Sequence, residues 1–211
     1  MSTRPQRPTI GEGRHRVRRG EGDLLREQIL DAGARLLADL GDEHQVSMRA
    51  VADAVGVTPP SLYLHFSSKT SLLRAVVERL FAELEQEVAT ARAGAEHPVA
   101  RVLAFAHAYV ELGLRHPGRY RVLYETGLVP SLMPATDVVP GRELLDDVAG
   151  DLEAARADGV LGDLDPWATA ARVWQFLHGA VSLRINKPGL PWGDPGADVD
   201  AGVRALLGAG G

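Results

Sequence analysis

The sequence predicts an all-α protein, with a small N-terminal three-helix domain followed by a larger helical bundle. Along most of the chain, apolar residues recur at steps of three and four, the spacing of one face of an α-helix. No long stretch alternates apolar and polar residues as a half-buried strand would, and no internal repeat is present. Glycine and proline separate the periodic segments and so mark where the helices end.

The composition is that of an ordinary globular protein. Of the 211 residues, 45% are hydrophobic and 24% are charged. The absence of cysteine excludes disulfide frameworks, thiolate metal sites and a cysteine nucleophile. The N-terminus lacks the apolar core of a signal peptide, and no apolar run approaches the roughly 18 residues of a membrane span. We therefore expect a cytoplasmic protein that does not enter a membrane.

Residues 1–22 are expected to form a disordered basic arm. They contain several glycines and few apolar residues, and residues 1–20 carry six arginines against the single acid Glu12. Because the whole chain has a net charge of -5, this basic character is local. Such an arm could contact phosphates or a DNA minor groove through Arg18 and Arg19, but a solvated tail has the same composition.

Residues 23–67 predict three helices around a shared apolar core. The first has Asp23 as its N-cap and stops at Gly41. The second is capped by Ser47, runs through Val55 and ends at Gly56, because glycine adopts the left-handed conformation that closes a helix. The core filling comes from Ala52, Val55, Val57, Leu62 and Phe66.

The third helix begins at Thr58-Pro59-Pro60-Ser61 and is expected to close around Phe66. Proline suits a first turn, because the amides there have no partner within the helix. With Thr58 as N-cap, its hydroxyl has only the amide of Ser61 to bind, since Pro60 has none. Two short helices joined by Gly56-Val57-Thr58 have the geometry of a helix-turn-helix, whose second helix enters the major groove of DNA.

The rest of the chain predicts further helices separated by short breaks. They are expected at 68–93, around 102–110, at 119–127, 141–157 and 166–185, and more weakly at 198–207, with loops at 128–140 and 186–195. Residues 74–211 carry no catalytic signature, and His97, His107, His116 and His178 lack the spacing of a helical metal pair. We therefore expect no enzyme activity, no cofactor and no metal.

The stretch from Leu25 to Leu73 closely resembles the DNA-binding domain of the tetracycline-repressor (TetR) family. The matching features are Ser47, Ala52, Gly56-Val57, Leu62-Tyr63-x-His65-Phe66, Lys69 and Leu72. The resemblance implies a homodimer whose two recognition helices enter successive major grooves of a palindromic operator, about 34–36 Å or more apart. By position it also implies phosphate contacts from Ser47, Tyr63, His65 and Lys69, and base contacts from Arg49, Pro60 and Ser61.

The recognition helix lacks the side chains that usually identify bases. Thr58 to Phe66 contains no Arg, Lys, Asn or Gln. Readout then depends on Arg49, on contact of Pro59 or Pro60 with thymine methyl groups, and on DNA shape. The alternatives are a half-buried surface aromatic for Tyr63 and a solvated helix charge for Arg49.

The segment Trp174-Gln-Phe-Leu-His178-Gly179 resembles the Trp-x-x-x-His-Gly element that names a C-terminal subclass of the family, the WHG domain. Trp174 and His178 share a helix face, and small residues after them allow a helix to approach closely. They belong either to the core or to an effector pocket with Phe105, Tyr109 and Tyr124. The resemblance also implies a dimer interface made by the helices at 141–157 and 166–185.

The sequence therefore predicts a DNA-binding transcriptional regulator. Residues 23–67 are expected to bind a double-stranded operator, and residues 68–211 to dimerise and to bind a small-molecule effector that releases a repressor. An activator is a variant of the same interpretation. The alternative from another class is a helical small-molecule-binding protein or enzyme without DNA function, which would show no salt-dependent DNA affinity.

Overall fold

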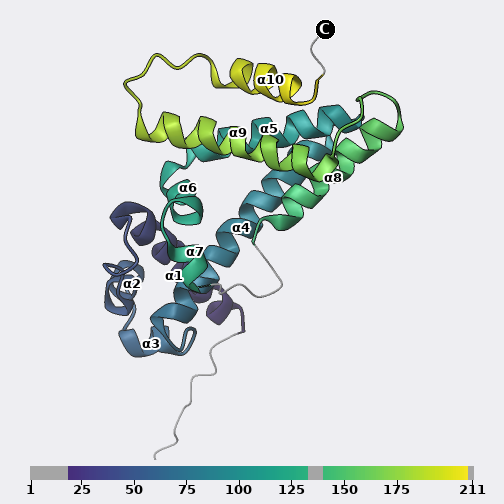
Figure 1. The fold of residues 1–211 in the computed structure, drawn as a ribbon. Helices are drawn as coiled ribbons and strands as arrows, with labels where there is room; N and C mark the ends of the chain where they lie inside the picture. Colours follow the sequence, from purple (N-terminus) through teal and green to yellow (C-terminus); the bar gives the residue numbers. More distant parts are fainter. Residues whose placement is uncertain (1–18, 133–139, 209–211) are drawn as a thin grey trace, which may run out of the picture.

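The computed structural model describes residues 19–132 and 140–208, and within these ranges every regular element is an α-helix (Figure 1). The all-α prediction is confirmed. The helices are α1 (Arg19–Leu40), α2 (Met48–Val55), α3 (Pro59–Tyr63), α4 (Lys69–Ala93), α5 (Pro98–Arg115), α6 (Pro117–Tyr124), α7 (Leu128–Leu132), α8 (Arg142–Ala157), α9 (Pro166–Asn186) and α10 (Pro195–Leu206).

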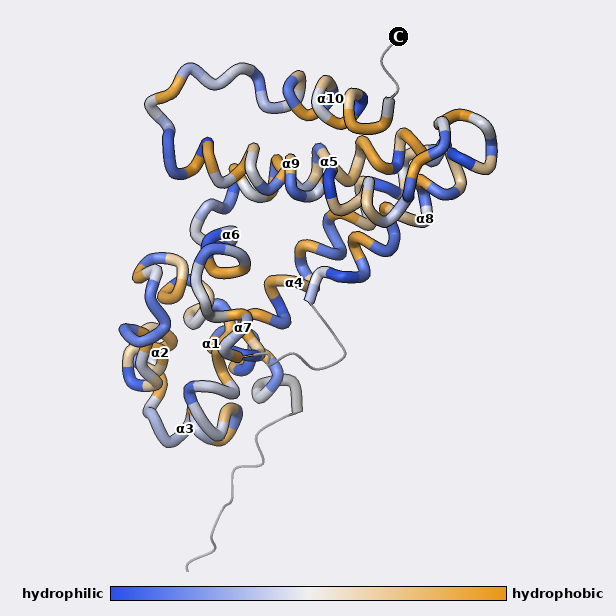
Figure 2. Tube along the Cα trace, in the orientation of Figure 1, coloured by the Kyte–Doolittle hydropathy of each residue, from blue (hydrophilic) through white to orange (hydrophobic). Residues whose placement is uncertain are grey.

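Helices α1 to α3 form a unit at one end of the molecule, and α4 leads from this unit into the body (Figure 1). In the body α5 packs against α4, α8 and α9, and α10 lies along α9 and α5. Helix α6 contacts both α1 and the body. The buried apolar side chains form one cluster that spans both parts. Along α4 and α8 hydrophobic and hydrophilic residues alternate, as the three-to-four-residue periodicity of the sequence requires (Figure 2).

The helix starts follow from their first residues. Ser68 and Ser71 bond each other's backbone amides at the start of α4, and Asp165 and Asp194 accept amide hydrogen bonds at the starts of α9 and α10. Proline occupies the first turn of each of the last two helices, where no intrahelical amide bond is lost. These signals explain why the boundaries of α4 and α9 agree closely with the sequence expectation.

The start of the first helix is a correction. Helix α1 begins at Arg19, so residues 19–22 are helical rather than part of a disordered arm, and Asp23 lies inside the helix instead of capping it. Glycines 20 and 22 lower the helix propensity of this first turn, which is why the sequence favours a later start. The rest of the expected arm, including Arg18, lies outside the described residues.

Other boundaries also differ from the prediction: helix α6 covers residues 117–124 instead of 119–127, with Pro117 in its first turn. Helix α3 ends at Tyr63, short of Phe66, and α7 lies within the expected loop 128–140. Helix α7 forms because Pro130 falls in its first turn, while Leu132 is buried and its carbonyl accepts a bond from Arg74 at 2.8 Å. Helix α10 starts three residues early, because Asp194 caps it.

One buried carboxylate connects three helices of the body. Asp151 of α8 is 6% exposed and accepts hydrogen bonds from Arg92 of α4 at 2.7 Å and from Arg101 of α5 at 2.6 Å. Two guanidinium groups offset the cost of removing this carboxylate from water. No helix among the described residues combines the length and the apolar character needed to cross a membrane.

Candidate nucleic-acid interface and ligand cavity

The turn between α2 and α3 is fixed by its caps. Ser47 Oγ accepts the amide of Ala50 at 3.0 Å, which starts α2. At the other end Gly56 has a φ of 81°, and the amides of Gly56 and Val57 donate to the carbonyl of Ala52 at 2.9 and 3.0 Å. A side chain at position 56 would be strained in this conformation. The predicted cap and stop are confirmed, and they set where α3 begins.

Helix α3 directs Leu62 inward, and Phe66 follows it into the core. The guanidinium of Arg26 lies 5.3 Å from the centroid of the Phe66 ring and so packs α1 against this segment. Thr58 occupies the N-cap position, but the expected hydrogen bond from the Ser61 amide to its hydroxyl is absent. That amide instead donates to the Thr58 carbonyl at 2.9 Å, and the two hydroxyls lie 3.0 Å apart. The carbonyl satisfies the amide first, which leaves the hydroxyls to each other.

The outer side of α3 carries the residues expected to contact DNA. Thr58, Pro60 and Tyr63 are exposed, and Pro59, Ser61 and His65 are partly buried. Tyr63 is 51% exposed, so it is available to a partner while part of its ring packs on the protein. Leu64, which the sequence reasoning passed over, is 86% exposed. Its position beside Tyr63 in the family motif was the signal that could have drawn attention to it.

Two cationic residues, Arg49 and Lys69, lie on the helices before and after α3. The side chain of Arg49 on α2 is 85% exposed, and its nearest acid is Asp53, one turn on, at 3.9 Å. Lys69 is the first residue of α4 and is partly buried. Arg19 is the first residue of α1. Arg49 is therefore free to approach a base edge, and Lys69 lies where a helix N-terminus also attracts phosphate.

A cavity of about 270 Å³ lies in the body between α5, α6, α8 and α9. Its wall includes four of the five residues predicted for an effector pocket: Phe105, Tyr109, Tyr124 and Trp174. The remainder of the wall is mostly apolar and comes from Pro140, Gly141, Arg142, Leu144, Leu145 and Trp167. Aromatic rings that are far apart in sequence thus meet around one space, which is suited to an apolar ligand.

His178, the fifth predicted residue, lies behind this wall rather than in it. Its Nδ1 is 2.8 Å from the hydroxyl of Tyr120 and 3.4 Å from that of Tyr109, and the Tyr120 hydroxyl also lies within 3.1 Å of the His178 carbonyl. The ring of Tyr120 is 5.2 Å from that of Tyr124, centroid to centroid. Sequence reasoning missed Tyr120, whose place four residues before Tyr124 was the available signal.

Burial shifts the pKa values of the phenols in the cavity wall and of the histidine behind it. It raises the pKa of Tyr109 well above its usual value and that of Tyr124 to about 12. Burial lowers the pKa of the His178 imidazole, and the nearby carboxylate of Glu125 opposes that shift only in part. Phenols are protonated at neutral pH in any case, and the lowered pKa makes the neutral imidazole the favoured form of His178.

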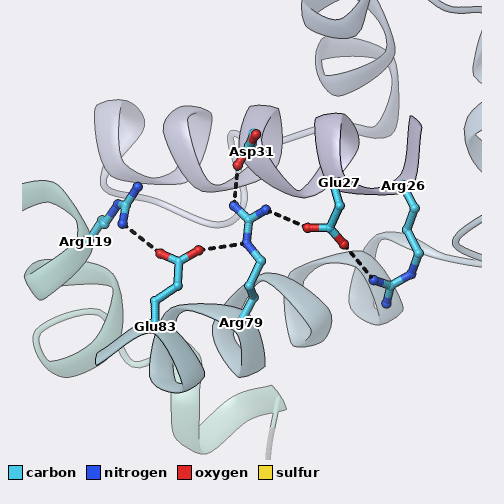
Figure 3. A network of polar contacts seen from close by, with 6 residues as sticks. All are labelled: Arg26, Glu27, Asp31, Arg79, Glu83 and Arg119. Carbon is cyan, nitrogen blue, oxygen red and sulfur yellow. Dashed lines mark hydrogen bonds and ion pairs between the residues drawn. The ribbon is translucent and has the colours of Figure 1, made fainter. Parts of the chain in front are cut away.

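Arg79 of α4 connects the N-terminal unit to the body (Figure 3). Its guanidinium pairs with Asp31 at 2.6 Å and Glu27 at 3.3 Å, both on α1, and with Glu83 on its own helix at 3.3 Å. Glu83 also accepts a hydrogen bond from Arg119 of α6 at 2.7 Å. Helices α1, α4 and α6 thus share one network of charges.

Two family profiles match the chain. The profile described as "Bacterial regulatory proteins, tetR family" matches residues 29–76, which include α2, α3 and the start of α4. The profile described as "Tetracyclin repressor-like, C-terminal domain" matches residues 102–209, which include the Trp174 to Gly179 segment. Both ends of the molecule therefore match profiles of one kind of protein.

Relatives of this chain include proteins named as transcriptional regulators. The chain is 31% identical over 140 residues to the HTH-type transcriptional activator FasR of Mycolicibacterium smegmatis, which covers 66% of this chain and 64% of that protein. It is 30% identical over 195 residues to the HTH-type transcriptional regulator Rv0681 of Mycobacterium tuberculosis, covering 88% and 84%. Its fold matches AibR in complex with isovaleryl coenzyme A and operator DNA, with a TM-score of 0.65 and 22% identity over 87% of this chain and 98% of that one.

Proposed function

The chain belongs to the TetR family of DNA-binding transcriptional regulators, and we propose that it is a repressor that binds a palindromic operator as a homodimer and is released by a small molecule. The observation that carries this proposal is the outer face of α3, exposed at the end of the molecule and followed by Lys69 at the start of α4. In a helix-turn-helix that face enters the major groove, while phosphate contacts set its position.

The proposed functions belong to different parts of the fold. The helix-turn-helix unit, which ends near residue 67, binds DNA, and the helices from α4 onward bind the effector and dimerise. A protein that regulates transcription must lie in the same compartment as the chromosome, so we propose that this protein is cytoplasmic. The proposal assigns the chain no catalytic role.

Helices α8 and α9 are the proposed dimer interface. Leu183 of α9 is 49% exposed, which is apolar surface that a second copy could cover. Gly150 of α8 and Gly179 of α9 have no other atom within 4 Å of where a Cβ would stand. Small residues facing open space allow helices of a second chain to come close, as in a four-helix contact.

The effector is proposed to occupy the aromatic cavity. Its volume of about 270 Å³ falls just below the roughly 300–1,000 Å³ of sites for drug-sized ligands, which favours a small apolar molecule. The AibR complex contains isovaleryl coenzyme A, and a short acyl group is one chemical type of suitable size. To lower the fraction of dimers in the DNA-binding conformation from 99% to 1%, the effector must bind the other conformation more tightly by about 5.5 kcal/mol.

Selection of bound sequences from random DNA by the purified full-length protein tests the DNA-binding proposal. We expect one palindrome to be enriched, with an affinity that falls steeply as salt rises. Enrichment of no sequence, or binding that is indifferent to salt, would contradict the proposal and favour a small-molecule-binding protein or enzyme.

Intrinsic fluorescence tests the effector site. Trp167 and Trp174 line the cavity, whereas Trp192 lies in the segment between α9 and α10, stacked on Arg184. The Trp192→Phe variant therefore retains only the two tryptophans of the cavity. We expect an effector to change their emission and, at the same concentration, to reduce operator binding. A molecule that releases DNA without changing their emission would place the effector site elsewhere.

A further inference from the structure

Leu64 has the highest exposed fraction, 86%, among the large hydrophobic side chains whose exposure the structure describes. Val160 and Leu24 follow at 64% and 61%. A single exposed leucine is common on protein surfaces and needs no explanation by itself. The position of Leu64 is the informative part, because it directly follows α3 on the proposed DNA-binding face.

The helical register places Leu64 opposite the core. Its backbone remains helical, with φ -70° and ψ -24°, so the turn of α3 continues through it. At about 100° per residue, Leu64 lies roughly 200° around the axis from the buried Leu62. Pro60, four residues earlier, lies on the same outward stripe and is also exposed. This outward stripe of the recognition segment therefore carries two exposed apolar side chains.

We propose that Leu64 contacts the methyl group of a thymine in the major groove and thereby selects a T·A pair in each half of the operator. This inference rests on the proposed function. Because residues 58–66 contain no side chain that usually pairs with a base edge through two hydrogen bonds, apolar contact is a direct readout open to this segment beside single hydrogen bonds such as that expected from Ser61.

Leu64 suits this contact better than its apolar neighbour. The proline ring at position 60 closes on its own backbone, whereas the leucine side chain extends beyond its Cβ and ends in two methyl groups. Tyr63 and His65, on either side, are the residues proposed to contact phosphates. Contacts on both sides of Leu64 would hold it over the groove rather than over one strand.

Replacing thymine with uracil tests the proposal, because it removes only the methyl group. Each thymine of the selected operator is replaced in turn, and affinity is measured for the full-length protein and for Leu64→Ala. We expect one thymine at which the replacement weakens wild-type binding about fourfold per half-site, or about fifteenfold when both half-sites carry it, the effect of losing one buried methyl contact. Leu64→Ala should bind the thymine and uracil operators equally at that position.

Two further variants serve as controls. Leu190→Ala removes another leucine, 52% exposed, that lies far along the chain from α3, and it should keep the full uracil effect. Pro60→Ala, at a residue that is also expected to contact bases, should keep the uracil effect at the thymine that Leu64 contacts, whatever its effect on overall affinity. The proposal is overturned if no thymine responds to the replacement, if Leu64→Ala still discriminates, or if only Pro60→Ala loses discrimination. In these cases the palindrome and the proposed function remain, whereas failure of the selection to enrich any palindrome overturns both.

Discussion

Gly118 of α6 lies so close to Ala38 of α1 that a Cβ at position 118 would stand 2.7 Å from the Ala38 Cβ. Helix α1 belongs to the N-terminal unit, whereas α6 carries Tyr124 at the cavity wall and Tyr120 behind it. One short helix thus separates the cavity from the DNA-binding part. A ligand that displaces α6 toward α1 meets a contact with no free space, so it must move α1 as well.

Gly118→Ala tests whether this contact matters. The added methyl group forces α6 and α1 apart, and overpacking of this kind costs about 1–3 kcal/mol, of which the lower chain entropy of alanine recovers about 0.5–1 kcal/mol. We expect a loss of about 1–2 kcal/mol in unfolding free energy and weaker operator binding without ligand. Urea unfolding at one fixed protein concentration and a binding titration measure the two effects.

Gly162→Ala is the matched control. No other atom lies within 4 Å of a Cβ at position 162, and this glycine has no positive φ. Its unfolding free energy should stay within about 0.5 kcal/mol of wild type. If Gly118→Ala behaves like this control in both assays, the α6–α1 contact transmits nothing.

Arg79→Met is expected to weaken the connection between α1 and α4. The Arg79 side chain is 17% exposed, whereas its partners Glu27 and Asp31 are 55% and 56% exposed, so water screens part of the interaction. We expect a loss of about 1–2 kcal/mol in unfolding free energy, and a smaller loss in high salt. Arg156→Met, at a side chain that is 41% exposed and pairs with Glu153 of its own helix, should cost less. Equal losses for both variants would show that the place of Arg79 in the network is unimportant.

His178 should make stability depend on pH in a defined direction. Its pKa is lowered in the folded protein, so below the unfolded value of about 6.5 the unfolded chain binds more protons. The contribution of neutral His178 to the unfolding free energy is complete above pH 6.5, and it is lost as the pH falls through the lowered pKa of the folded protein. In His178→Gln, unfolding free energy should therefore decline less between pH 7.5 and 5 than in wild type. A decline as steep as that of wild type would rule out His178 as the source.

The sequence was most informative where one residue type has one structural use. Ser47, Gly56 and Ser68 mark helix ends through their own backbone or hydroxyl chemistry, and the structure has them in those places. Thr58 was less predictable, because its carbonyl and its hydroxyl compete for the same amide. Helix α7 was missed because its stability depends on burial of Leu132 and on Arg74, far away in sequence.

The candidate sites depended still more on distant contacts. Phe105, Tyr109, Tyr124 and Trp174 could be named from their type, but their meeting around one cavity requires three helices to pack correctly. The same packing turns His178 away from the cavity and toward Tyr120. The exposure of Leu64 likewise depends on the register of α3 against its core, which the shared motif alone does not reveal.

Arg49 and Lys69 should respond differently to removal. Arg49 is almost fully exposed and its one ion pair is long, so it can reach a base edge, and Arg49→Ala should lose about 1–3 kcal/mol of discrimination between operator and random DNA. Lys69→Gln should weaken binding to both DNAs and lower the slope of log affinity against log salt by about one per phosphate contact. Arg204→Ala in α10, which removes the same charge far from α3, should change neither quantity. Equal loss on operator and random DNA for Arg49→Ala would assign Arg49 to the phosphates, because a base contact weakens only the binding of the sequence that contains the base.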